Sequence, residues 1–79
     1  MNTQEAVSWI AEIFEEPPER VAPDTPREEM PGWDSLGVLN LMAALDERFD
    51  IQLTEDEMEA MERVADILAI LQRDGALDG

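Results

Sequence analysis

Hydrophobic residues near the N-terminus recur at the spacing of an α-helix. Four of them fall at i, i+3, i+4 and i+7 and so share one face: Val7, Ile10, Ala11 and Phe14. Asn2 followed three residues later by Glu5 matches a capping box, which marks the start of a helix. Pro17 and Pro18 cannot continue a helix, because proline lacks the backbone N–H and clashes with the preceding turn. The pattern therefore predicts a first helix that these prolines stop.

The segment 15–32 contains all five prolines of the chain. We interpret it as a long ordered loop, with Val21 as its anchor to the core. A connection of this length is unusual in a compact domain, where structureless stretches beyond about 12–15 residues are mostly functional or disordered.

The apolar pattern returns after Gly32 and runs to Phe49, which predicts the main helix of the chain. Five residues share its broad core face: Val38, Leu41, Met42, Leu45 and Phe49. Asp34 and Ser35 are candidates for the N-cap. A second apolar stripe lies outside the core face and consists of Leu36, Leu39 and Ala43. Burial in a core explains the first face and leaves the second unexplained.

Two further helices follow. Thr54 and Glu57 form a second capping box, which predicts a short third helix carrying Met58 and Met61. Apolar residues at helical spacing predict a fourth helix: Val64, Ile67, Leu68 and Leu71. Gly75 marks its end. The expected fold is all-α, a four-helix bundle with three main helices and a short third helix, forming one domain over residues 1–79.

Composition limits the function. A chain of 79 residues buries only roughly 60% of the surface that its unfolded form exposes, so a deep catalytic cleft is not expected. The absence of cysteine and histidine removes the usual nucleophilic thiol, the commonest general base and the commonest metal ligands. We therefore expect no catalytic residue and no independent enzyme activity. The N-terminus has no signal-peptide pattern and no apolar run is long enough to span a membrane, so a cytoplasmic protein is expected.

The charge of the chain is strongly negative. Twenty acidic residues stand against five basic ones, all arginine, for a formal net charge of −15. Nucleic acids and anionic membranes are therefore poor partners, and basic protein surfaces are good ones. The acidic stretch after Asp50 does not match a calcium loop, because EF-hand spacing needs glycine at position 55 and glutamate at 61, where the chain has Glu55 and Met61. We expect a solvated helix face there and no dedicated metal site.

Ser35 is the residue best placed to carry chemistry. A phosphate attached to a serine at the start of a helix faces unpaired backbone N–H groups and the positive end of the helix dipole. The alternative is that Ser35 merely caps the helix. A capping box built on Ser35 would want Glu or Gln at position 38, which is Val38, and Asp34 can serve as the cap instead.

These residues carry a resemblance to a known family. Asp34-Ser35-Leu36, followed by an apolar helix, resembles the attachment motif of acyl carrier proteins. The likeness extends along nearly the whole chain, through the proline-rich loop with Val21, Leu45–Phe49 at the end of the main helix, the exit Phe49–Leu53, the acidic third helix and Val64–Leu68. It implies that a phosphopantetheinyl transferase moves a 4′-phosphopantetheine arm from coenzyme A to Ser35, with Asp34 in contact with the transferase and its magnesium. The thiol of the arm would then hold an acyl group as a thioester.

The resemblance also offers a role for the second stripe, although apolar residues scattered singly on a surface need no explanation. Leu36, Leu39 and Ala43, flanked by Asn40, Asp46 and Glu47, are similar to the surface through which carriers dock on partner enzymes. The partners implied are the transferase and acyl-loading, acyl-modifying or acyl-transfer enzymes with basic docking patches. Electrostatic steering would make binding fast, transient and sensitive to salt.

Three positions depart from the family pattern. Gly37 and Asn40 stand where fatty-acid carriers usually have acidic residues, which favours a specialised role and makes this face less negative. Gly37 should also cost up to about 1 kcal/mol relative to alanine inside a helix and loosen its first turn. Arg63 replaces a threonine that often caps the fourth helix, which leaves that cap in question.

Three methionine residues have two interpretations. Met42, Met58 and Met61 are either flexible core filler or, as the resemblance implies, the lining of an expandable acyl slot between the second and third helices. Trp9 is either a half-exposed packing residue, which we favour, or part of a surface contact. Trp33 is expected to cover the loop end beside Ser35.

The sequence predicts a carrier of acyl intermediates in a specialised lipid or polyketide-type pathway, monomeric by default. Two alternatives stay open: an aminoacyl or peptidyl carrier, and an unmodified acidic helical protein-interaction module. The aspartate before Ser35 resembles acyl carriers more than peptidyl carriers.

Overall fold

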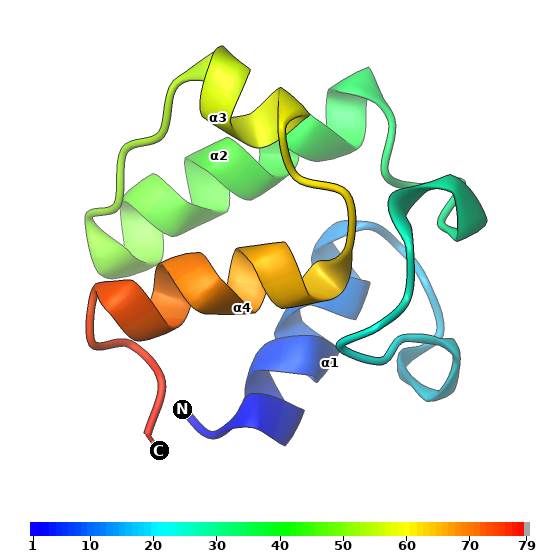
Figure 1. Cartoon of the computed structure of the whole chain (residues 1–79), viewed down its shortest axis with the longest axis horizontal. Helices are drawn as coiled ribbons and strands as arrows, with labels where there is room; N and C mark the ends of the chain where they lie inside the picture. The colour runs from blue at the N-terminus through cyan, green and yellow to red at the C-terminus, as the bar shows by residue number, and fades with distance from the viewer. Residues whose placement is uncertain (79) are drawn as a thin grey trace.

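The computed structural model describes residues 1–78 and contains four α-helices joined by turns (Figure 1). The helices are α1 (Thr3–Ile13), α2 (Ser35–Phe49), the short α3 (Glu55–Glu59) and α4 (Val64–Arg73). Two 3-10 turns, η1 (Pro18–Arg20) and η2 (Arg27–Glu29), lie between α1 and α2. Across the described residues the only β-type pairing is an isolated bridge between Pro26 and Arg63. The predicted all-α bundle with a short third helix is confirmed.

Both predicted capping boxes are present. The Asn2 side chain accepts a hydrogen bond from the Glu5 backbone N–H at 2.8 Å, and Thr54 Oγ1 accepts one from the Glu57 N–H at 3.2 Å. Gly75 follows α4 with a φ of 78°, in the left-handed region that glycine adopts without steric cost. These local signals predicted the helix ends correctly because each depends only on neighbours in sequence.

The end of α1 differs from the prediction. The helix ends at Ile13, before the first proline is reached. Glu15 takes a left-handed conformation with a φ of 58°, and the Glu16 N–H donates to the Ala11 carbonyl at 2.8 Å. This pattern of hydrogen bonds is the usual way in which a helix satisfies its last carbonyls. The turn therefore stops α1, and the prolines only follow it.

The loop between α1 and α2 is ordered, as predicted, but it is not structureless. Three backbone hydrogen bonds tie it to the start of α4 and the residues just before it: Arg27 N–H to Glu62 O at 2.8 Å, Val64 N–H to Thr25 O at 3.1 Å and Ala65 N–H to Pro23 O at 2.7 Å. Val21 is buried as expected, and Met30 and Trp33 are buried with it. These bonds and side chains give a proline-rich segment a fixed path.

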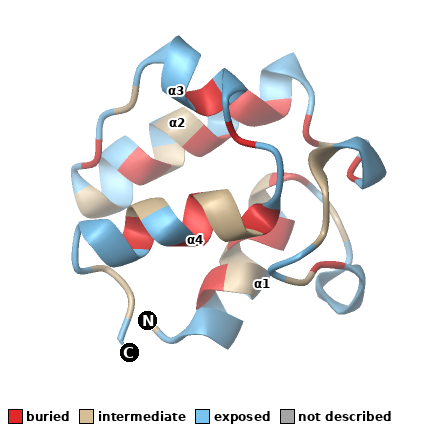
Figure 2. Cartoon of the chain, in the orientation of Figure 1, coloured by how far each residue is buried: buried red, intermediate tan, exposed pale blue. Residues whose placement is uncertain are grey.

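The core lies between α1, α2 and α4, with α3 closing one side (Figures 1 and 2). Its fully buried large side chains come from all four helices and from the C-cap of α1: Ile10, Phe14, Leu41, Leu45, Met58, Val64, Ile67 and Leu71. Trp9 packs edge-on against Phe49 with ring centroids 5.4 Å apart, as the packing interpretation requires. Of the helices described, none is both long enough and apolar enough to cross a bilayer.

Candidate functional site

Ser35 is the first residue of α2, and its hydroxyl is exposed. The N-cap is Asp34, whose Oδ1 accepts a hydrogen bond from the Gly37 backbone N–H at 2.9 Å. Asp34 therefore does the capping that Ser35 could have done. Among the described residues the Ser35 hydroxyl has no hydrogen-bond partner, so it is available for covalent modification.

Close packing holds the first turn of α2 in place. Gly37 is buried, and a Cβ atom added to it would lie 2.1 Å from the Gly32 carbonyl oxygen and 2.9 Å from Cδ1 of Phe14. The Phe14 ring in turn stacks on Trp33 with ring centroids 5.0 Å apart. The expectation that Gly37 changes the exposed face was wrong, because the glycine faces inward and permits a backbone contact.

The six residues predicted to bind partners all lie on the exposed surface of α2. Leu36 and Leu39 are the exposed large hydrophobic residues of the described chain, at 66% and 55% exposure. Ala43 is exposed in line with them, and the polar flank consists of Asn40, Asp46 and Glu47. The structure thus brings an apolar strip and its acidic flank together on one face of α2, beginning at Leu36, the residue after Ser35.

A hollow of about 240 Å³ opens beside Ser35. It lies between α2, α3 and the start of η2, with apolar walls from Val38, Leu39 and Met42 and carboxylates from Glu55 and Glu59. We call it the Ser35 groove. Only one of the three methionines predicted for an acyl slot lines this groove, since Met58 and Met61 are buried in the core. Met58 and Met61 therefore pack as core residues, and of the three only Met42 borders the Ser35 groove; an acyl slot stays a prediction.

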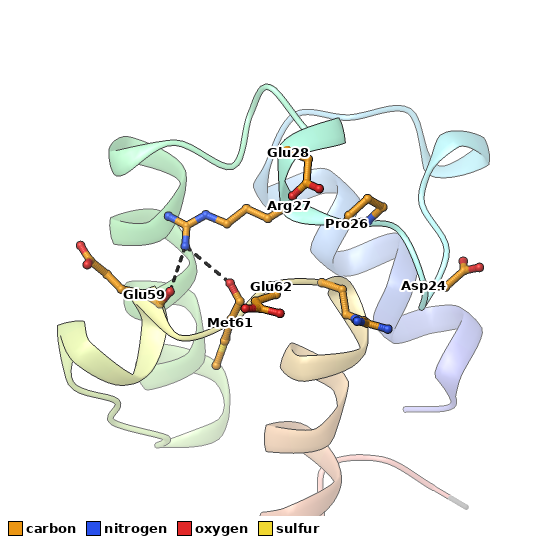
Figure 3. Close-up of a pocket in the computed structure, with 8 residues that line it drawn as sticks. Asp24, Pro26, Arg27, Glu28, Glu59, Met61 and Glu62 are labelled. Atoms are coloured by element: carbon orange, nitrogen blue, oxygen red, sulfur yellow. Dashed lines mark hydrogen bonds between the residues drawn. The ribbon is translucent and has the colours of Figure 1, made fainter.

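Arg27 also lines the Ser35 groove, and the sequence analysis missed it. Its guanidinium lies 5.7 Å from the centroid of the Trp33 ring, and Nη1 donates to the carbonyl oxygens of Glu59 at 3.3 Å and Met61 at 3.5 Å (Figure 3). Arg27 also lines a second hollow of about 520 Å³, whose other lining residues are mostly charged (Figure 3). Residues this far apart in sequence meet only through the fold, so no local signal could have identified Arg27.

Comparison with known proteins agrees with this geometry. The family described as "Phosphopantetheine attachment site" matches residues 6–71. The chain belongs to this family. An acyl carrier protein of Sulfurovum sp. is 35% identical over 63 residues, which cover 80% of this chain and 84% of that relative. An acyl carrier protein of Akkermansia muciniphila is 38% identical over 42 residues, or 53% of this chain and 52% of the relative.

Family membership confirms three predictions. The protein is a carrier and not an enzyme, and its prosthetic group is 4′-phosphopantetheine. As a carrier it works with a phosphopantetheinyl transferase and with enzymes that handle acyl groups.

The residues of this carrier fit the prosthetic group. An exposed serine hydroxyl can form the phosphodiester, and within the described chain the backbone N–H groups of Ser35 and Leu36 have no acceptor and remain open to phosphate oxygens. The groove offers apolar walls beside them and one cation, Arg27. When bound, the arm supplies a thiol, which this cysteine-free chain lacks.

The start of α4 resolves the question raised by Arg63. The Arg63 side chain makes no capping hydrogen bond. Asp66, in the first turn, accepts hydrogen bonds from the backbone N–H groups of Glu62 at 2.8 Å and Arg63 at 3.2 Å. The cap is therefore supplied from inside the helix, and its carboxylate also faces the positive end of the helix dipole.

Proposed function

We propose that Ser35 carries the 4′-phosphopantetheine arm and that residues 1–79 act as a single carrier domain. The observation that carries this proposal is the exposed, unpartnered hydroxyl at the start of α2, beside a groove, in a chain of this family. In the transfer the Ser35 oxygen forms a bond to the phosphorus of coenzyme A that bears the pantetheine. The bond to adenosine 3′,5′-bisphosphate breaks, and the hydroxyl proton leaves to the transferase.

Asp34 has two compatible roles in this proposal. Its Oδ1 is engaged with the Gly37 N–H, which fixes the direction of the helix start. The carboxylate is exposed and keeps its second oxygen free for a transferase and its magnesium ion. Leu36, next to Ser35 and 66% exposed, offers the transferase its first apolar contact.

The docking face consists of Leu36, Leu39, Asn40, Ala43, Asp46 and Glu47. A small apolar strip with an acidic flank suits partners that present an apolar patch rimmed by basic residues. The contact is small and its charges are exposed, so binding is transient and the carrier passes from one enzyme to the next. It acts as a monomer in this scheme.

The cargo we propose is an acyl intermediate of a specialised lipid or polyketide-type pathway. The relatives found are acyl carrier proteins, which favours acyl over aminoacyl or peptidyl cargo. Asn40 is exposed in the middle of the docking face, where an acidic residue is usual in fatty-acid carriers, and this favours partners other than those of general fatty-acid synthesis.

Intact mass tests the attachment site. The purified protein is incubated with coenzyme A, magnesium and a broad-specificity transferase, and we expect a gain of one phosphopantetheine located on Ser35 by fragmentation. Ser35→Ala should gain nothing, whereas Ser8→Ala, which removes the other serine of the chain from an exposed site on α1, should be modified like wild type. Modification of Ser35→Ala, or none of wild type, would overturn the proposal.

The charge of −15 favours one alternative role for this surface, as an acidic interaction module that does not need the arm. Such a module would bind its partner equally well before and after Ser35→Ala substitution. A carrier requires the arm, so a pull-down that compares the modified protein with Ser35→Ala separates the two functions.

A further inference from the structure

Arg27 is held at the Ser35 groove by contacts on three sides. Its backbone N–H donates to the Glu62 carbonyl at 2.8 Å, which fixes the main chain. The Nη1 bonds to Glu59 O and Met61 O orient the end of the side chain, and the guanidinium lies 5.7 Å from the Trp33 ring centroid. A long side chain with this many contacts has already lost most of its rotamer freedom, so a ligand that meets it loses little further entropy.

The guanidinium keeps unused donors. It has five N–H groups, and the observed bonds involve Nη1 alone. Figure 3 shows Nη1 turned toward Glu59 and Met61 and the other terminal nitrogen turned toward α2, drawn in green. Within the described residues Arg27 forms no ion pair with a carboxylate. Its charge and its remaining donors are therefore available on the side that faces α2.

Arg27 and Ser35 line the same hollow of about 240 Å³. Arg27 is the only cation among the lining residues, and Glu55 and Glu59 line the groove as well. A phosphate at Ser35 brings a further negative charge next to these carboxylates in a chain whose net charge is already −15. A guanidinium offsets this repulsion and matches phosphate oxygens with paired N–H donors.

We propose that Arg27 binds the prosthetic arm: its guanidinium donates hydrogen bonds to the phosphodiester on Ser35 and draws the arm into the Ser35 groove. The inference rests on the proposed attachment of the arm to Ser35. Arg27 is a binding residue for the arm, and it links the loop that contains η2 to α3 through the same side chain. Attachment of the arm therefore tightens the contact between this loop, α2 and α3.

The test compares apo and modified forms of four proteins: wild type, Arg27→Met, Arg27→Lys and, as a control, Arg20→Met. Methionine removes the donors and keeps an unbranched side chain, whereas Arg20 is exposed in η1 and does not line the groove. Intact mass first establishes that each protein carries the arm. The readouts are the ³¹P chemical shift of the phosphodiester, the Arg27 side-chain N–H resonance and the melting temperature of each apo and modified pair.

We expect modification to raise the melting temperature of wild type and Arg20→Met by about 2–5 °C more than that of Arg27→Met. The ³¹P shift should differ from wild type in Arg27→Met, differ less in Arg27→Lys and stay unchanged in Arg20→Met. For each variant the melting temperature of the apo form is subtracted from that of the modified form, which removes any effect of the substitution on the apo fold.

The outcomes separate the two proposals. If all four proteins are modified on Ser35 but Arg27→Met shows the wild-type ³¹P shift and the wild-type gain in melting temperature, the role of Arg27 is refuted and the attachment site stands. If the mass of wild type does not change, the attachment site is wrong and the role of Arg27 is lost with it.

Discussion

Alanine at position 37 should destabilise the carrier, although helix propensity alone predicts the opposite. Gly→Ala in a helix interior gains about 1 kcal/mol of stability. In this helix the new Cβ atom would lie 2.1 Å from the Gly32 carbonyl oxygen, which belongs to the backbone, and 2.9 Å from Phe14 Cδ1. Relieving such overpacking typically costs about 1–3 kcal/mol, and a rigid backbone neighbour favours the upper end of that range.

The net expectation for Gly37→Ala is a loss of about 1–2 kcal/mol, or a melting temperature lower by about 5–15 °C for a domain of this size. Urea and thermal unfolding followed by circular dichroism measure it. Asn40→Ala is the matched control, because it makes an exposed substitution in the same helix and should stabilise by about 0.5 kcal/mol.

Gly37→Ala also links packing to function. Since Gly37 lies two residues after Ser35, displacement of the Gly32 segment should shift the first turn and slow modification by the transferase in Gly37→Ala. Stabilisation of Gly37→Ala by as much as Asn40→Ala would refute the reasoning, because it would mean that the Gly32 carbonyl moves away without cost.

Three further predictions follow from the caps, the docking face and the charge. Asp66→Ala should cost about 1 kcal/mol in urea unfolding beyond Asp24→Ala, which removes the same charge without a cap; equal stabilities would contradict the capping role. The double substitution Leu36→Ser and Leu39→Ser should change the free energy of unfolding by no more than about 0.5 kcal/mol but lower the kcat/KM of the transferase by about tenfold or more. Ala69→Ser, an exposed substitution on α4, should leave this kcat/KM unchanged. An unchanged kcat/KM for the double variant would exclude the proposed docking face. The melting temperature should rise between about 0.01 and 1 M salt, because the Debye length falls from about 30 to 3 Å and salt then screens the repulsion within a chain of net charge −15. A lower melting temperature at high salt would show that attractive ion pairs dominate.

The helices were predictable because their signals are local. The capping boxes at Asn2 and Thr54, the apolar periodicity of α2 and the glycine after α4 each involve residues within a few positions of one another. The same holds for the exposure of Leu36 and Leu39, which follows from their place outside the core face of α2. Helical geometry alone converts such spacing into a prediction of faces.

The loop and the groove could not be predicted, because they depend on contacts between distant segments. Arg27 meets the carbonyl groups of Glu59 and Met61 only after α3 has packed beside the loop. Gly37 was misread for the same reason, since the Gly32 carbonyl that requires it belongs to the preceding loop. Backbone contacts of this kind leave no periodic pattern, and a glycine in a helix has the same appearance in sequence whether it is exposed or covered.

Around Ser35, the residues that would contact a partner differ from the residues that carry the negative charge. The strip that would touch a partner is apolar or neutral at Leu36, Leu39 and Asn40, and the one cation of the groove, Arg27, lies beside it. The carboxylates stand around this strip: Asp34 precedes it, Glu55 and Glu59 lie across the groove, and Asp46 and Glu47 lie toward the end of α2. Attraction at long range therefore comes from charges that need not be desolvated on docking, and exposed charges of this kind raise the association rate more than they slow dissociation. A carrier that must leave each enzyme after one transfer benefits from this separation, because stronger electrostatic steering raises the association rate without slowing dissociation to the same degree.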